Sequence, residues 1–298
     1  MRTLNPGVLR ALLDPATGPL LLAGAANALS ARVVEEQGFQ AVYVTGAGIS
    51  NTFLGAPDVG LLTVSELTAH VEAISESVSI PIVVDADTGF GNPINVRRTV
   101  RQLERAGASA IQIEDQITPK RCGHFAGKEV ISADEMIAKI KAAVDARVND
   151  DLVIIARTDA RAVRGLDEAC DRAAQYREAG ADVLFVEAPR SLEEMRHITA
   201  QVPGLHLANM VEGGLTPILS RDQLRDLNYA AVLYANSAMR ASVQAMRAVL
   251  AHLNEHGDTK GVEDLMIDWS DRQALVGKDV YDELDRRYSV GEHASGQR

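Results

Sequence analysis

Short apolar runs alternate with longer segments of helical periodicity along most of the chain. The apolar runs are rich in β-branched residues, which is typical of strands buried on both faces. Between these runs, apolar residues recur at helical spacing. The predicted strands are Leu20–Ala23, Ala41–Thr45, Ile82–Asp85, Ala110–Glu114, Val153–Arg157, Val183–Glu187, His206–Asn209 and Ala231–Tyr234. The clearest predicted helices are Asn95–Ala106, Ser132–Arg147, Leu166–Ala179 and Ser220–Leu227.

Four predicted helices end in a similar turn that leads directly into an apolar run. The stretches are EEQGFQAVYVTG, ERAGASAIQIED, REAGADVLFVEA and RDLNYAAVLYAN, and Gly38, Gly107 and Gly180 occupy the same place in three of them. Eight strands of this kind favour a closed parallel barrel over a doubly wound sheet, which more often has fewer strands. We therefore predict an α/β fold, a (β/α)8 TIM-type barrel.

The chain continues beyond what such a barrel requires. A long helix is predicted over residues 237–253, and the charged segment after it ends in a further helical stretch, Val280–Tyr288. We predict a catalytic barrel domain over residues 1–255 and a C-terminal helical extension over residues 256–298 that packs on a neighbouring subunit. For Gly291–Arg298, a solvated tail is the alternative.

Charge and cysteine content restrict the partners and the compartment. The formal net charge is −11 and no basic run offsets it, so we expect neither nucleic acid nor a membrane as a partner. The apolar run from Leu20 to Leu29 is too short to span a bilayer and no basic segment adjoins it. The only cysteines are Cys122 and Cys170, which favours a reducing compartment, and we expect the cytoplasm.

Acidic residues follow the predicted strands at the end where a barrel carries its active site. Asp85 and Asp87 are two residues apart, so both carboxylates point the same way on an extended strand, and Glu114 closes the adjacent strand. Clustered carboxylates are costly without a cation, and Mg²⁺ prefers such ligands together with water. We predict a Mg²⁺ site, with Mn²⁺ as an alternative ion. For each acid taken alone, a helix cap or a salt-bridge partner is the alternative.

Arg157 closes the fifth predicted strand. Its planar guanidinium can bind a substrate carboxylate through parallel hydrogen bonds. The alternative is a structural ion pair with Glu187, which closes the next strand, and both can hold at once.

The segment Lys120-Arg121-Cys122-Gly123-His124 is the sharpest chemical signal in the chain. Basic neighbours lower the pKa of a thiol, and a glycine lets the backbone approach a ligand closely. Cys122 is therefore a candidate catalytic residue, although simple surface charge is the alternative. Cys170 lies in a predicted helix and is expected to be an inert, packed thiol.

Two glycine patterns are weaker. Gly46-Ala47-Gly48 follows a strand as a dinucleotide-binding motif does, but position 51 is Asn instead of the required glycine. Gly213-Gly214 and Asn236-Ser237 follow the last two strands, where many barrels bind phosphate, and this interpretation stays open.

The chain resembles the isocitrate lyase and phosphoenolpyruvate mutase superfamily over nearly its whole length. The stretches that carry the resemblance are VYVTGAGISN, DADTGFGN, IQIEDQ, PKRCGH, ARTDA, FVEAP and LANMVEGG. The KRCGH element is similar to that of the lyases, which use the cysteine as a catalytic acid. The resemblance therefore implies a carbon–carbon lyase.

By this resemblance, Asp85 and Asp87 hold Mg²⁺ directly or through water, with Asp58, Glu114 and Glu187 around them. Thr45, Gly46, Gly123, Arg157, Glu187 and Asn209 bind the substrate, and Thr45 replaces the serine that is common in the family. The catalytic residues are Cys122, Tyr43, Arg157, His124 and Lys120. The last helices are expected to pair with or swap into a neighbouring subunit of a homotetramer.

The implied reaction is a retro-aldol or Claisen-type cleavage of a 2-hydroxy dicarboxylate. Tyr43 is a candidate base, which requires a lowered pKa, and Cys122 is the acid. Methylisocitrate lyases often carry a basic residue directly after the histidine, whereas Phe125 follows His124 in this chain. We therefore expect a 2-alkylmalate or 2,3-dimethylmalate type of substrate that gives pyruvate and a carboxylate. Cleavage of 2-methylisocitrate, then oxaloacetate hydrolysis, are alternatives. A phosphate-ligand enzyme and a catalytically silent barrel are alternatives of another class.

Overall fold

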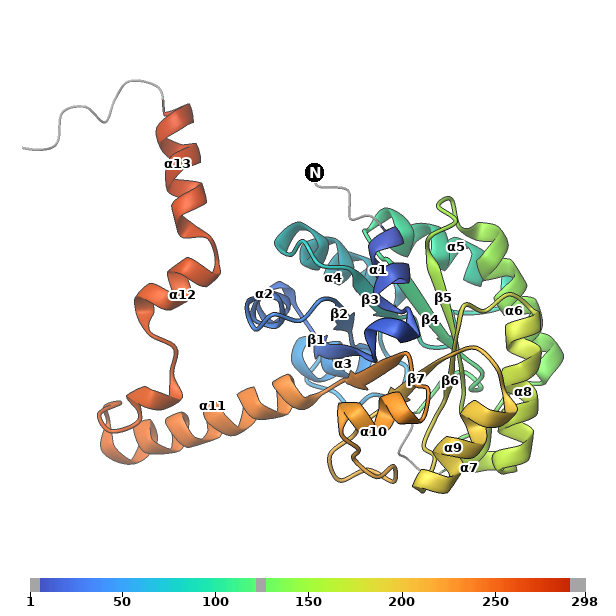
Figure 1. Ribbon diagram of the computed structural model, residues 1–298. Coiled ribbons are helices and arrows are strands. Elements are labelled where there is room, and N and C mark those ends of the chain that lie inside the picture. The colour runs from blue at the N-terminus through green and yellow to red at the C-terminus, as the bar shows by residue number, and fades with distance from the viewer. Residues whose placement is uncertain (1–5, 122–126, 290–298) are drawn as a thin grey trace, which may run out of the picture. The chain divides into compact units, whose positions relative to one another are not determined.

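The chain folds around a closed barrel of parallel strands. The computed structural model describes residues 6–121 and 127–289, and each strand pairs with the next while β1 pairs with β8 (Figure 1). The strands are β1 (Leu20–Ala25), β2 (Val42–Val44), β3 (Ile82–Asp85), β4 (Ala110–Glu114), β5 (Val153–Thr158), β6 (Val183–Val186), β7 (Leu205–Asn209) and β8 (Ala231–Tyr234). Each strand matches one of the predicted apolar runs, so the predicted (β/α)8 TIM-type barrel is confirmed.

Helices follow the strands and surround the barrel (Figure 1). They are α1 (Pro6–Leu12), α2 (Ala28–Glu36), α3 (Gly46–Phe53), α4 (Val64–Ser77), α5 (Pro93–Arg105), α6 (Ala133–Ala146), α7 (Ala160–Arg164), α8 (Leu166–Glu178), α9 (Leu192–Gln201) and α10 (Arg221–Asp226). After β8, α11 (Ser237–His256) begins and continues into the C-terminal unit. A short 3-10 helix, η1 (Pro15–Thr17), precedes β1. Ser132 and Ser220 cap α6 and α10, so these helices begin one residue later than predicted.

Two separate apolar layers fill the barrel unit. One lies inside the barrel and includes Leu22, Tyr43 and Phe185. The other lies between the strands and the surrounding helices and consists of two clusters. Leu9 of α1 and Leu13 pack with the interior layer, while Arg10 donates hydrogen bonds to the carbonyls of residues just before β5. The helix α1 therefore covers the N-terminal end of the barrel. The opposite end, where barrels of this kind carry their active sites, is not covered by α1.

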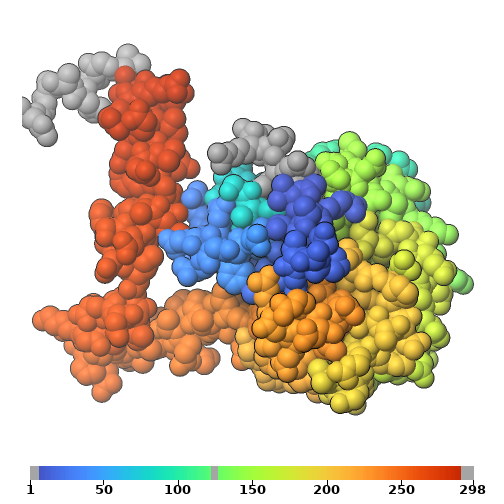
Figure 2. All heavy atoms as spheres, viewed as in Figure 1, coloured from blue at the N-terminus to red at the C-terminus, as the bar shows by residue number. Residues whose placement is uncertain are grey.

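The chain divides into two compact units, Met1–Arg240 and Ala241–Arg298. The C-terminal unit contains most of α11, η2 (Glu263–Leu265), α12 (Trp269–Leu275) and α13 (Lys278–Tyr288). Figure 2 shows the described atoms of this unit in orange to red. Its described residues include large apolar side chains that are open to solvent in the single chain, among them Leu250, Trp269 and Tyr281. The predicted domain boundary between residues 255 and 256 and the swapping of the last helices stay predictions.

None of the described helices combines the length and the apolar character needed to cross a membrane.

Candidate functional site

The strand-end acids that the sequence singles out lie at the C-terminal end of the barrel. Asp85 closes β3 and pairs in register with Gln112 of β4, and Asp87 follows in a left-handed backbone conformation with φ of 47°. A Cβ atom on Gly46, the first residue of α3, would lie 3.3 Å from a carboxylate oxygen of Asp87 and 3.5 Å from one of Asp85. The glycine therefore keeps the space beside both carboxylates open.

Lys120 is a buried cation within this acidic group. Its Nζ lies 2.5 Å from Asp58 and 2.9 Å from Asp87. Burial raises the pKa of Asp87 to about 7, although Lys120 acts in the opposite direction. Asp58 and Asp87 are therefore salt-bridge partners, as the alternative interpretation of the acids holds. Their partner Lys120 lies among the acids that the sequence analysis assigned to a metal site.

Arg157 is surrounded by carboxylates at the end of β5. Its Nε lies 2.9 Å from Asp159 and 3.2 Å from Glu114, and its Nη2 lies 3.8 Å from Glu187. The guanidinium also lies over the ring of Phe185. The structural ion pair with Glu187 is therefore present, together with two acidic partners that the sequence did not link to Arg157.

Glu187 also accepts hydrogen bonds from the side-chain nitrogen of Asn209, at 3.3 and 3.4 Å. The side-chain oxygen of Asn209 is buried and has no partner among the described residues. A buried acceptor without a partner costs free energy, so this oxygen suits a ligand that donates a hydrogen bond.

Tyr43 points into the barrel and is tied to Asp85 through Gln112. Its hydroxyl donates to the side-chain oxygen of Gln112 at 3.0 Å, and the Gln112 amide donates to Asp85 at 3.4 Å. Burial, followed by the charge of Asp85, raises the pKa of Tyr43 well above its ordinary value. The protein groups therefore do not supply the lowered pKa that a phenolate base requires. Gln112 was missed in the sequence, where a single polar residue in AIQIE was its only signal.

Residues of the two glycine patterns and their neighbours make local hydrogen bonds. Thr45 caps α3 by accepting a hydrogen bond from the Gly48 amide, and its hydroxyl donates to Asn236 at 3.3 Å. At the other pattern, Ser237 and Arg240 both donate to the Glu212 carboxylate. Gly46 thus belongs to a capped helix start beside the acids, and Thr45 joins it to the loop after β8.

Cys122, Gly123 and His124 lie outside the described residues, so their predicted roles stay predictions. Cys170 is buried in α8, and burial raises the pKa of its thiol to about 11. It is the packed, inert thiol that the sequence predicts.

The residues at the barrel mouth fit a Mg²⁺ ion held by few protein ligands and by water. The Oε1 of Glu114 is buried without a hydrogen-bond donor among the described residues, whereas the Oδ1 of Asp87, also buried, lies 2.9 Å from the Nζ of Lys120. The acidic side chains also outnumber the basic ones, since Asp58, Asp85, Asp87, Glu114, Asp159 and Glu187 accompany Lys120, Lys128 and Arg157. Within residues 6–121 and 127–289, however, no three His, Cys, Asp or Glu side chains lie close enough together to hold one metal ion. The predicted convergence of Asp85, Asp87 and Glu114 on one ion is therefore not found, and a mostly hydrated ion is the better fit.

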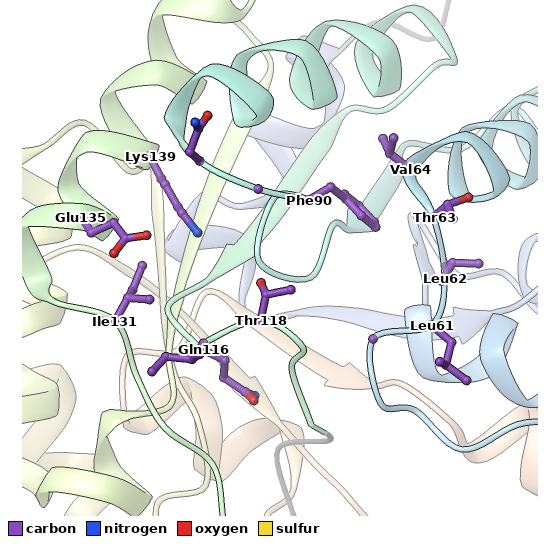
Figure 3. Close-up of a pocket in the computed structure, with 14 residues that line it drawn as sticks. Leu61, Leu62, Thr63, Val64, Phe90, Gln116, Thr118, Ile131, Glu135 and Lys139 are labelled. Carbon is purple, nitrogen blue, oxygen red and sulfur yellow. The ribbon is translucent and has the colours of Figure 1, made fainter.

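A cavity of about 590 Å³ lies between the loops that follow β2, β3 and β4 and the start of α6 (Figure 3). Its walls include Leu62, Phe90 and Ile131, and the Lys139 ammonium points toward it while donating to the Thr88 carbonyl at 3.2 Å. Of the predicted active-site residues that the structure describes, none lines this cavity.

Comparison with known proteins places the chain in a family. The Phosphoenolpyruvate phosphomutase family matches residues 9–254. A 2,3-dimethylmalate lyase of Eubacterium barkeri is 48% identical over 268 residues, which cover 90% of this chain and 93% of that protein. A 2-methylisocitrate lyase of Aeropyrum pernix is 46% identical over 286 residues, which cover 96% and 92%.

Solved structures agree with these relatives. A crystal structure of 2,3-dimethylmalate lyase, described as a PEP mutase/isocitrate lyase superfamily member, has a TM-score of 0.91 and 35% identity, and covers 100% of this chain and 99% of that one. A phosphonopyruvate hydrolase in complex with oxalate and Mg²⁺ has a TM-score of 0.85 and 32% identity, and covers 95% and 98%. The chain therefore belongs to the phosphoenolpyruvate mutase/isocitrate lyase superfamily and is a lyase of that superfamily.

Proposed function

We propose that this protein is a Mg²⁺-dependent carbon–carbon lyase that cleaves a 2-alkylmalate or 2,3-dimethylmalate type of 2-hydroxy dicarboxylate to pyruvate and a carboxylate. The observation that carries the proposal is the buried Glu114 carboxylate at the barrel mouth. One of its oxygens contacts the buried Arg157 guanidinium, and the other has no donor among the described residues. Such a pair suits a substrate that offers hydroxyl and carboxylate oxygens together. The 48% identity to a 2,3-dimethylmalate lyase favours this substrate class.

Each residue has a role in the proposed binding mode. Asp85 and Asp87 hold the metal directly or through water, and Asp58 and Glu114 surround them. Bound Mg²⁺, or Mn²⁺ in its place, polarises the hydroxyl and carboxylate oxygens of the substrate. Arg157 binds a substrate carboxylate, Asn209 accepts a hydrogen bond, and Thr45, Gly46, Gly123 and Glu187 line the pocket.

The proton transfers are assigned to two residues. Tyr43 removes the hydroxyl proton, which requires the charge of the bound cation to offset the raised pKa of its phenol. Cleavage of the C2–C3 bond leaves a carbanion on the departing carboxylate fragment, and the Cys122 thiol protonates it. Lys120 and His124 stabilise the negative charge that develops there.

Cleavage of 2-methylisocitrate to pyruvate and succinate is the second candidate. The 46% identity to a 2-methylisocitrate lyase over 96% of the chain favours it specifically.

We also propose a homotetramer in which the C-terminal helices pack on or swap with a neighbour. The exposed apolar side chains of the C-terminal unit support this assembly, because patches of this kind usually mark interfaces. Light scattering that gives the mass of a monomer would contradict it. The low cysteine count further favours the cytoplasm.

A coupled assay for pyruvate tests the proposed activity. The substrate panel contains 2-methylmalate, 2,3-dimethylmalate, 2-methylisocitrate, isocitrate and oxaloacetate, each with Mg²⁺ and with EDTA. We expect the highest kcat/KM for 2,3-dimethylmalate or 2-methylmalate and no release of pyruvate in EDTA. A highest kcat/KM for 2-methylisocitrate selects the second candidate, and absence of pyruvate from every substrate rules out the proposed reaction.

A further inference from the structure

Buried lysine–aspartate pairs lie before and after Cys122 in the sequence. Before Cys122, Lys120 pairs with Asp58 and Asp87. After it, the Nζ of Lys128 donates to the Oδ1 of Asp159 at 2.7 Å. The side chain of Lys128 is 3% exposed and that of Asp159 is fully buried. The second pair is not among the residues with a predicted role.

Asp159 binds Lys128 and Arg157 at the same time. Its Oδ2 accepts from the Arg157 Nε at 2.9 Å, and its Oδ1 accepts from the Arg157 Nη2 at 3.2 Å. Among the described residues, none accepts a hydrogen bond from the Nη1 of Arg157. This nitrogen is therefore the part of the guanidinium that is available to a bound carboxylate.

Asp159 is itself fixed by a buried network behind the barrel mouth. Its backbone amide donates to Asp115 at 2.9 Å, and Asp115 also accepts from Thr158, Tyr176 and Arg172. A carboxylate held in this way cannot turn to follow a moving partner, so it fixes the orientation of the two cations it binds.

The charges around Arg157 give Lys128 a further effect. Glu114, Asp159 and Glu187 all face the single guanidinium, and together they offset its attraction for a substrate carboxylate. The Lys128 ammonium adds a second positive charge on the oxygen of Asp159 that Arg157 shares. Removal of Lys128 leaves Asp159 to neutralise Arg157 alone.

We propose that Lys128 is a positioning residue for substrate binding: by sharing Asp159 with Arg157, it sets the guanidinium orientation and preserves its positive charge for the substrate carboxylate. Its proposed effect is exerted through Arg157. This inference rests on the carboxylate-binding role of Arg157 in the proposed function, but not on the identity of the substrate.

Oxalate binding in the presence of Mg²⁺ tests the inference without turnover. Isothermal titration calorimetry would compare the wild-type protein with Lys128→Met, Lys128→Arg and the control Lys141→Met, which removes an exposed lysine of α6. We expect Lys128→Met to weaken oxalate binding by about tenfold or more, as the loss of a charged hydrogen bond does. Lys128→Arg should restore most of the affinity, and Lys141→Met should leave it unchanged.

Steady-state kinetics on the best substrate of the panel give an independent result. For Lys128→Met, the KM should rise by a factor similar to that of the oxalate Kd, while kcat falls less. An unchanged oxalate Kd and KM together with a lower Tm would show that Lys128 is only structural, and the inference would be wrong.

Should Lys128→Met not fold, Lys128→Gln keeps a donor for Asp159 without the charge, and unchanged oxalate binding in that variant overturns the inference equally. If no substrate yields pyruvate but oxalate binding depends on Lys128, the proposed function fails while this inference stands.

Discussion

The hydroxyl of Tyr43 donates a hydrogen bond to the side-chain oxygen of Gln112 across 3.0 Å. Because the Gln112 amide donates to Asp85, the phenol is linked to a proposed metal ligand by way of one side chain. In this arrangement the proton of Tyr43 points at Gln112, and its oxygen lone pairs are left for another donor. A substrate hydroxyl is such a donor, and this geometry supports the proposed contact between Tyr43 and the substrate.

The first prediction concerns the variant Tyr43→Phe. Loss of a group that takes part in proton transfer lowers kcat by about 100-fold or more. Steady-state pyruvate release measures the effect. Tyr229→Phe is the control, since among the described residues its hydroxyl donates a hydrogen bond to the Met195 carbonyl alone, at 3.5 Å. Equal kcat values for the two variants would show that Tyr43 takes no part in the reaction.

The barrel could be predicted from the sequence because its strands are short apolar runs, each separated from the next by a segment of helical periodicity. The structure adds α3 and α7, which the sequence did not predict. Gly46–Phe53 begins with small residues, and Ala160–Arg164 has only five residues, so neither shows a helical period of apolar side chains. Both helices follow directly from strands at the site.

The residues of the candidate site could be predicted only where a charged side chain stands at the C-terminal end of a strand. Asp85, Arg157 and Glu187 fulfil that rule, and they do lie at one end of the barrel. The pairing of Lys128 with Asp159 spans 31 positions along the chain and depends on how the segment after β4 returns to β5, which no local pattern reports. Gln112 was missed because it is one polar residue in an otherwise apolar strand.

The second prediction compares the two cysteines of the chain. Cys122→Ser should lower kcat by about 100-fold or more, because a serine hydroxyl is a much weaker acid than a thiol. Cys170→Ser is the matched control and should keep wild-type kcat, since its thiol is packed in α8 and its pKa is raised to about 11. Full turnover by Cys122→Ser is incompatible with a cysteine acid.

The third prediction concerns the metal. Since an ion that binds only the folded state stabilises it, Mg²⁺ should raise the Tm of the wild-type protein. In Asp87→Asn the Mg²⁺-dependent rise should be reduced or lost. The Tm of this variant in EDTA should exceed that of the wild type, because burial and neighbouring acids destabilise the ionised Asp87 carboxylate.

Differential scanning calorimetry with Mg²⁺ and with EDTA measures both effects on Asp87→Asn. Asp226→Asn, at the exposed end of α10, should respond to Mg²⁺ as the wild type does. A wild-type response to Mg²⁺ in Asp87→Asn would show that this carboxylate does not bind the ion.

The fourth prediction concerns the stability of the barrel in mild acid and rests on His206 at the start of β7. Burial lowers the pKa of His206 below its ordinary value of 6.5, and its Nε2 lies 2.7 Å from the Val202 carbonyl. Below pH 6.5 the unfolded chain therefore binds a proton at this residue that the folded protein does not bind. The free energy of unfolding should fall as the pH decreases from 6.5 toward the folded-state pKa, and this contribution should be constant above that window.

Urea unfolding of the wild-type protein and His206→Gln, at pH 7.5 and at pH 5.5, isolates the contribution of this side chain. The variant should lose less stability between the two pH values than the wild type, and an equal loss in both proteins would mean that His206 does not determine the acid sensitivity.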